Sequence, residues 1–269
     1  MATTLELGVV LAALAARYPA ERASDWDAVG LVCGDPQEPI ERILFAVDPV
    51  AETVDEAIAL GAGLLVTHHP LFLEPVHGVP ADDPKGRLVH RLVRSGVALF
   101  VAHTNADAAT PGVSDALASA LGLVDVGPLT PDSDIGRIGR VSEPVRLGDF
   151  ARSVARALPA TAGGVKVSGD LDAEIRRVAV CGGAGGSLLA AVIESGADVY
   201  VTSDLSHHRA LDARAGGLPA IIDVAHWAGE WPWLEQAAQL LRVDLGVSTV
   251  DVAVSTRCTD PWTWQGSTN

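Results

Sequence analysis

Short apolar runs rich in β-branched residues alternate with segments of helical periodicity along most of this chain. In the first half, strands are expected at 42–49, 63–69 and 97–103, with helices at 50–62 and 86–96 between them. Buried strands separated by helices of this length form βαβ units around a largely parallel sheet. The pattern therefore predicts an α/β fold.

The second half repeats the alternation, with strands expected at 176–186, 198–204 and 218–226 and a helix at 187–197. Two pairs of segments also align between the halves. "AIALGAGLLVTHH" lies over "AVIESGADVYVTSD", and "VAHTNAD" lies over "VAHWAGE". Because both halves place Ala-His-x-x-x-acid after an apolar strand, we hypothesise an internal duplication.

The duplication predicts two similar α/β domains, 1–127 and 128–269, which pack together around one metal site. The segment 128–144, "PLTPDSDIGRIGRVSEP", is the expected linker because it is rich in proline, glycine and charge. A chain of 269 residues is long enough for two such domains. A first helix is expected in "LGVVLAALAARYP", which lacks the basic leader of a signal peptide.

The net charge limits the binding partners that are expected, and the cysteine count indicates the cellular compartment. The formal net charge is −15, which argues against nucleic acid or an anionic membrane as the main partner. Three widely spaced cysteines form neither a disulfide framework nor a thiolate zinc motif. No segment reaches the roughly 20 apolar residues of a membrane span. A cytoplasmic protein without a membrane partner is expected.

Histidines and carboxylates gather just after the expected strands. They are His68 and His69, then His103 with Asp107, then His226 with Glu230. Residues four apart share one face of a helix. If a helix follows each strand, His103 with Asp107 and His226 with Glu230 can each present an imidazole and a carboxylate to one metal ion; we call each such pair a claw. In open α/β sheets, ligands bind beyond the carboxyl ends of the strands. Three groups of matching chemistry at such positions favour a metal site over surface histidines.

Five of these side chains are the expected metal ligands: His68, His69, Asp107, His226 and Glu230. Three imidazoles and two carboxylates crowd one ion but suit two, about 4 Å apart. Nitrogen and oxygen ligands without thiolate favour Zn, Fe, Mn, Co or Ni. Because a two-metal site activates water, metal-assisted hydrolysis is the expected class of reaction.

A glycine-rich stretch, "CGGAGGS" at 181–187, lies between an expected strand and an expected helix. The backbone amides of Gly182, Gly183, Gly185 and Gly186 could bind a phosphate at this position. The stretch is neither a dinucleotide-binding fingerprint nor a P-loop, since no Gly-Lys-Ser/Thr follows. Close packing of the strand against the helix explains the glycines equally well.

Seven segments, in order, resemble the Nif-three-like family of dinuclear-metal-centre proteins, also called GTP cyclohydrolase 1 type 2 homologues. They are "DWDAVGLVCGDP" (25–36), "THHPLF" (67–72), "AHTNADAA" (102–109), "VAVCGGAGGSLL" (178–189), "YVTSDLSHH" (200–208), "DVAHWAGE" (223–230) and "CTDPW" (258–262). The chain departs from the family pattern at Ala28, where asparagine is usual, and at Ser203, where glycine is common. Ala228 and Gly229 also alter the segment before Glu230.

The resemblance implies interlinked α/β domains in a homohexameric ring, with two divalent ions on the five ligands above. Glu230 would bridge the ions, and His103 would transfer protons or support the ligands. The implied reaction resembles that of GTP cyclohydrolase 1 type 2, with a metal-bound hydroxide attacking a purine nucleotide or related small molecule. Two alternatives stay open: a non-enzymatic metal-binding or regulatory ring, and a nucleotide-binding protein with structural metals.

Overall fold

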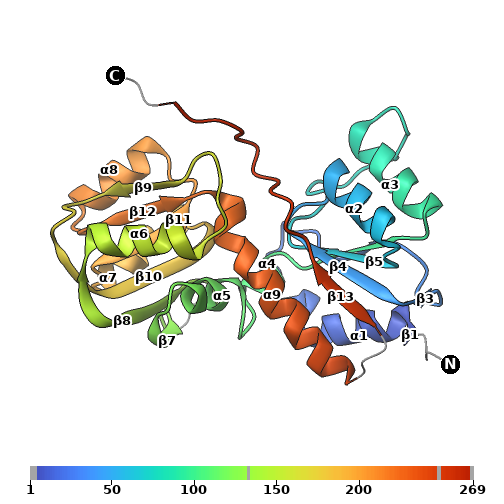
Figure 1. The fold of residues 1–269 in the computed structure, drawn as a ribbon, viewed down its shortest axis with the longest axis horizontal. Coiled ribbons are helices and arrows are strands. Elements are labelled where there is room, and N and C mark those ends of the chain that lie inside the picture. The colour runs from blue at the N-terminus through green and yellow to red at the C-terminus, as the bar shows by residue number, and fades with distance from the viewer. Residues whose placement is uncertain (1–4, 132–133, 247–249, 267–269) are drawn as a thin grey trace. The chain divides into compact units, whose positions relative to one another are not determined.

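The computed structural model describes residues 5–131, 134–246 and 250–266, which fold into two compact units. Unit 1 comprises Met1–Ala109 and Leu234–Thr259, and unit 2 comprises Thr110–Trp233 and Asp260–Asn269. Each unit contains a sheet covered by helices, so the predicted α/β fold is confirmed (Figure 1). No helix within the described ranges has the length and apolar character needed to cross a membrane.

Unit 1 is built on a five-stranded sheet with the order β13-β4-β5-β6-β2. Its elements are β1 (Leu5–Glu6), α1 (Leu7–Arg17), η1 (Ala20–Arg22), β2 (Gly30–Cys33), β3 (Pro39–Ile40), β4 (Arg42–Ala46), α2 (Ala51–Leu60), β5 (Leu64–Thr67), α3 (Pro84–Arg94), β6 (Ala98–Val101), α4 (Thr104–Asp107) and β13 (Asp251–Val254). Strands β13, β4, β5 and β6 are parallel, and β2 is antiparallel to β6. The sheet strands predicted at 42–49, 63–69 and 97–103 are therefore confirmed.

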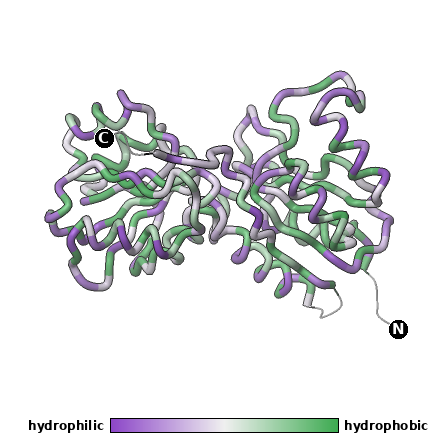
Figure 2. The backbone as a smooth tube through the Cα atoms, turned by 45° about the horizontal axis from the view of Figure 1, so that its top comes forward, coloured by the Kyte–Doolittle hydropathy of each residue, from purple (hydrophilic) through white to green (hydrophobic). Residues whose placement is uncertain are grey.

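The central strands of unit 1, β4, β5 and β6, are buried on both faces, as their continuous apolar runs predict. One face packs against α2 and α3 through a cluster that includes Leu44, Leu65, Val54 and Leu92. Helix α1 lies over the opposite face (Figure 1). Figure 2 shows hydrophobic stretches, in green, running through the interior and hydrophilic stretches, in purple, frequent at the periphery.

Helix α3 has clear start and stop signals. The Asp83 side chain accepts a hydrogen bond from Gly86 N at 2.8 Å, and Pro84 occupies the first turn, where it costs no intrahelical hydrogen bond. After the helix, Gly96 adopts a positive φ of 65°, which a residue with a Cβ adopts at a cost. These signals fix the helix that forms one wall of the cavity described below.

Unit 2 is built on a six-stranded sheet with the order β7-β8-β10-β11-β12-β9. Its elements are α5 (Val113–Ala120), β7 (Val124–Pro128), β8 (Arg137–Arg146), α6 (Leu147–Ala157), β9 (Val165–Ser168), β10 (Glu174–Ala184), η2 (Gly186–Leu188), α7 (Leu189–Glu194), β11 (Val199–Ser203), α8 (His207–Ala215) and β12 (Ile221–Val224). Helix α9 (His226–Leu245) begins in unit 2 and continues into unit 1.

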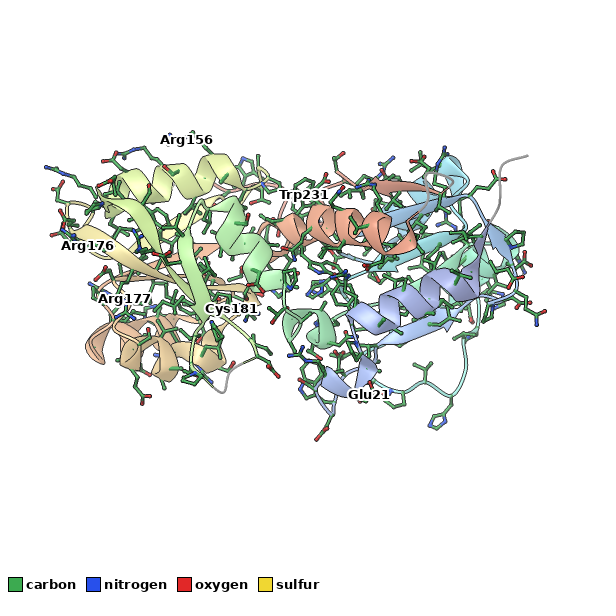
Figure 3. All side chains as sticks on the ribbon, turned by 90° about the horizontal axis from the view of Figure 1, so that it is seen from below. Glu21, Arg156, Arg176, Arg177, Cys181 and Trp231 are labelled. Carbon is green, nitrogen blue, oxygen red and sulfur yellow. The ribbon has the colours of Figure 1, made fainter. Side chains whose placement is uncertain are left out.

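In the unit 2 sheet, β10, β11 and β12 are parallel, whereas β9, β8 and β7 pair in antiparallel fashion. Helices α7 and α8 cover one face, where Cys181 and Tyr200 are buried together. Figure 3 shows Cys181 inside this unit, in a core without disulfides. The strands predicted at 198–204 and 218–226 are confirmed.

Two expectations differ from the structure. The glycine segment after residue 181 is not a simple turn, because β10 continues through Gly182 and Gly183 to Ala184. The expected linker 128–144 contains most of β8, although residues 132 and 133 lie outside the described residues. Strand β8 mixes polar and apolar residues, and most of its residues from Arg140 onward are exposed. Its composition therefore resembles that of a linker.

Candidate metal centre

Three histidines meet beyond the carboxyl ends of β5 and β6 in unit 1. Thr67 ends β5, so His68 and His69 follow it directly, and His103 follows β6 two residues after Val101. One ring nitrogen from each histidine lies within 4.8 Å of the others, a spacing at which the three could hold a metal ion. We call His68, His69 and His103 the histidine set.

Each ring in the histidine set forms a hydrogen bond through its Nδ1 atom. His68 Nδ1 lies 2.9 Å from the carbonyl oxygen of Ala102, and His69 Nδ1 lies 2.6 Å from Asp48 Oδ1. His103 Nδ1 lies 2.9 Å from Asp27 Oδ1. Carbonyl and carboxylate oxygens only accept, so each Nδ1 carries a proton, and in the neutral ring the lone pair lies on Nε2. This is the arrangement that metal-binding imidazoles need.

The two carboxylates that hold these rings are themselves anchored. Thr259 donates its hydroxyl to Asp48 Oδ2, and Thr104 donates its backbone N–H to Asp27 Oδ2 at 3.0 Å. Burial would raise the pKa of the Asp27 carboxyl, but hydrogen bonds from Thr104 and His103 outweigh it and lower the pKa. Asp27 is therefore an ionised acceptor at neutral pH.

The protonation state of His103 allows the ring to act as a metal ligand or as a base. Burial lowers the pKa of His103, and the neighbouring His68 lowers it further, although Asp27 acts in the opposite direction. The ring is consequently neutral at pH 7. A neutral imidazole can accept a proton or bind a metal, whereas a protonated one can do neither.

Asp107 lies in the single turn of α4, and its expected pairing with His103 stays a prediction. The His103 ring bonds to Asp27, and Asp107 Oδ1 lies 3.9 Å from His68 Nε2. The backbone of His103 lies outside the helix, with φ −109° and ψ −107°. Through its approach to His68, Asp107 adds a carboxylate to the donor set.

The second claw does form, within unit 2. Helix α9 begins at His226, and His226 Nε2 lies 2.8 Å from Glu230 Oε1 one turn later. His226 Nδ1 lies 2.7 Å from Asp204 Oδ2, which repeats the carboxylate support found in unit 1. Glu230 is only 3% exposed. Figure 3 labels Trp231, the next residue, on the same helix.

The glycines of β10 permit a close approach to this pair. A Cβ on Gly183, which has a φ of 70°, would collide with Glu230 Oε1 and lie 3.2 Å from His226 Nε2. A Cβ on Gly182 would lie 2.6 Å from Val113 of α5. The N–H of Gly185 donates to Thr202 Oγ1 at 2.9 Å, and nothing lies close to a Cβ on Gly186 except Leu205 at 3.6 Å. Close packing thus accounts for Gly182, Gly183 and Gly185, but not for Gly186, among the four glycines expected to bind phosphate.

Two departures from the family pattern contact each other. The buried Ser203 hydroxyl lies 3.2 Å from the position that a Cβ on Gly229 would occupy. The serine therefore fills space that glycine at 229 leaves open. At the third departure, the Ala28 backbone N–H donates to Asp27 Oδ1 at 2.8 Å, a bond that does not depend on the side chain at 28.

Sequence reasoning did not identify three of the residues that shape these groups: Asp27, Asp48 and Asp204. Asp48 lies two residues after the end of β4, and Asp204 directly follows β11; both are parallel strands. The available signal was an acid at the end of a strand adjacent to a histidine-bearing strand. Asp27 had a different signal, because it lies in the segment "DWDAVG" that resembles the family opening.

These features define a class of α/β protein with histidine–carboxylate groups, able to hold metal ions, beyond the ends of parallel strands. The family model Duf34/NIF3 (NGG1p interacting factor 3) matches residues 5–261. The chain therefore belongs to the Duf34/NIF3 family, and the expected family resemblance is confirmed.

Curated relatives are similar over nearly the whole chain. A "GTP cyclohydrolase 1 type 2 homolog" of Streptomyces coelicolor is 52% identical over 96% of this chain and 93% of its own length. One from Mycobacterium tuberculosis is 36% identical over 96% of this chain and 97% of its own length. Among solved structures, a Bacillus cereus protein related to NIF3 has a TM-score of 0.90 at 25% identity, covering 98% of this chain and all of its own. A Staphylococcus aureus hypothetical protein has a TM-score of 0.88 at 27% identity with the same coverage.

Proposed function

We propose that this chain is a metal-dependent hydrolase that acts on a small molecule, with a purine nucleotide as the first candidate. The observation that carries the proposal is the histidine set, in which every Nδ1 is held by an oxygen acceptor. Such support fixes the tautomer and orientation of metal-binding imidazoles. The relatives are named as homologues of GTP cyclohydrolase 1 type 2, which supports the choice of a nucleotide.

The donor chemistry fits divalent transition metals. The proposed ligands are His68, His69, Asp107, His226 and Glu230, with two divalent ions per chain. Imidazole and carboxylate donors without thiolate suit Zn, Fe, Mn, Co or Ni. When bound, such ions would lower the pKa of a coordinated water and polarise the bond to be cleaved.

Within this proposal, His103 moves the proton. Its Nε2 is available to accept a proton because the ring is neutral, and Asp27 stabilises the charge that the ring then gains. Asp27 also keeps the ring in one orientation through its bonds to Thr104. His103 also lies within the histidine set, so its substitution tests both roles.

Turnover of a defined panel tests the proposal. The chain, reconstituted separately with Zn, Mn, Fe and Co, is assayed on purine nucleotides and phosphoesters together with Glu230→Gln, His103→Gln and the exposed-loop control His77→Gln. We expect turnover in the wild type and in His77→Gln, and its loss in Glu230→Gln. Loss in His103→Gln with metal content retained would assign proton transfer to that residue. Turnover that Glu230→Gln leaves unchanged would contradict the proposal, and metal uptake without any turnover would support metal handling instead.

A further inference from the structure

A cavity of about 510 Å³ lies beside the histidine set, within unit 1. Asp48 and His69 form part of its wall, and the beginning of α3 forms another part. Its volume falls in the range of sites for small organic ligands. A molecule in this cavity would contact His69 directly.

The wall formed by α3 is cationic, in a chain with a net charge of −15. Lys85, Arg87 and Arg91 line the cavity, and α3 contains no acidic residue. Arg91 pairs with Asp55 across from α2. In the described part of the chain, neither Lys85 nor Arg87 forms an ion pair, although most other cations do. Two uncompensated cations thus face the same space.

The side chains of these two cations have defined supports. The Arg87 Nε donates to the carbonyl oxygen of Ala81 at 3.1 Å, which leaves the outer guanidinium nitrogens for a ligand. The Lys85 ammonium lies 5.9 Å from the centroid of the Phe72 ring. The acid in the cavity wall, Asp48, already accepts from His69 and Thr259.

The remaining wall is largely apolar, with Val50, Leu71 and Leu88 among its residues. Apolar walls with a few placed charges are typical of sites that bind organic anions. We propose that this cavity binds a small organic phosphate, whose anionic group contacts Lys85 and Arg87 and whose organic part contacts the apolar residues. The inference rests on the proposed function, because it assigns a substrate class to the hydrolytic site.

Equilibrium binding to the metal-free full chain, by calorimetry, tests this inference with three probes: GMP, guanosine and inorganic phosphate. We expect GMP to bind more tightly than either of the others, since it engages both parts of the cavity. The double variant Lys85→Ala, Arg87→Ala should bind GMP at least about tenfold more weakly, with guanosine binding unchanged. Higher salt should weaken GMP binding in the wild type.

The charge-matched control is Arg152→Ala, Arg156→Ala, which removes two exposed cations from α6 in unit 2 (Figure 3). GMP affinity should not change in this control. Equal affinity for GMP and guanosine, absence of GMP binding, or full GMP affinity in the Lys85/Arg87 variant would overturn the inference. Metal content, measured on separate portions reconstituted with metal, should equal that of the wild type in both double variants. Loss of GMP binding in a variant that takes up the normal amount of metal therefore separates this site from the metal centre, and failure of turnover alone would contradict only the proposed hydrolase.

Discussion

A single hydrogen bond at Nδ1 decides what each histidine of the candidate centre can do. Because carboxylates accept from Nδ1 of His69 and His103, the lone pair of each neutral ring lies on Nε2. Both ring nitrogens of His226 face a carboxylate, with Asp204 at Nδ1 and Glu230 at Nε2. Without that bond, either tautomer and several ring orientations become accessible. The supporting acid is therefore as important to metal affinity as the ring itself.

Asp204→Asn should weaken metal binding without unfolding the chain. The backbone φ of 56° at Asp204 is one that asparagine tolerates, so the substitution changes mainly the acceptor for His226. We expect a loss of about 10- to 100-fold in metal affinity, measured by competition with a chromogenic chelator. Asp212→Asn on the exposed side of α8 is the control and should keep the wild-type affinity. Equal affinity in both variants would show that the carboxylate at 204 does not support His226.

Gly183→Ala should disturb metal binding through space rather than through backbone strain. Gly164 has a similar positive φ of 57°, but nothing lies within 4 Å of a Cβ built on it, whereas a Cβ on Gly183 would collide with Glu230. Gly164→Ala should therefore cost only the backbone term, about 1–2 kcal/mol, with normal metal content. Thermal unfolding and elemental analysis of both variants check this. Normal metal content in Gly183→Ala would contradict the packing role assigned to the glycine.

At the scale of elements, the two sheets share one arrangement of four strands. In unit 1, β4, β5 and β6 are parallel and antiparallel β2 lies beside β6. In unit 2, β10, β11 and β12 are parallel and antiparallel β9 lies beside β12. Each antiparallel strand also precedes its three parallel partners in the sequence. This order agrees with the alignment of the two halves, and the duplication stays a hypothesis.

Helix α3 contributes stability through one face only. Leu92 is fully buried in the core of unit 1, whereas the adjacent Val93 is 60% exposed. Leu92→Ala should lower the free energy of unfolding by about 2–5 kcal/mol, since it removes core contacts and leaves a cavity. Val93→Ala should change it by no more than about 0.5 kcal/mol. Chemical denaturation of both variants measures the difference, and similar values would mean that α3 does not pack as described.

Hydrophobic periodicity predicted the buried strands and helices better than it predicted the linker and the course of the exposed strands. Parallel strands such as β5 and β11 are buried on both faces, so their apolar runs are visible in the sequence. The half-solvated β8 has a mixed pattern that composition alone does not distinguish from a linker. The path of β10 through two glycines depends on Val113 and Glu230, which are distant in sequence.

For the whole molecule, the sequence contained the donors but not their supports. The histidines and acids of the candidate centre follow strands, and the topology of parallel sheets brings such positions to one edge. The claw of His226 and Glu230 followed from helical spacing and is present in the structure. The pairing of Asp27 with His103 spans 76 residues, and local pattern contains no information on such a contact.

The metal content per chain shows whether this acidic α/β protein holds a metal centre. Elemental mass spectrometry on untagged protein, purified without chelator, should find about two equivalents of divalent transition metal. Glu230→Gln measured beside it should contain fewer. A chain that holds no metal, even after reconstitution with Zn, Mn, Fe and Co, would contradict the account.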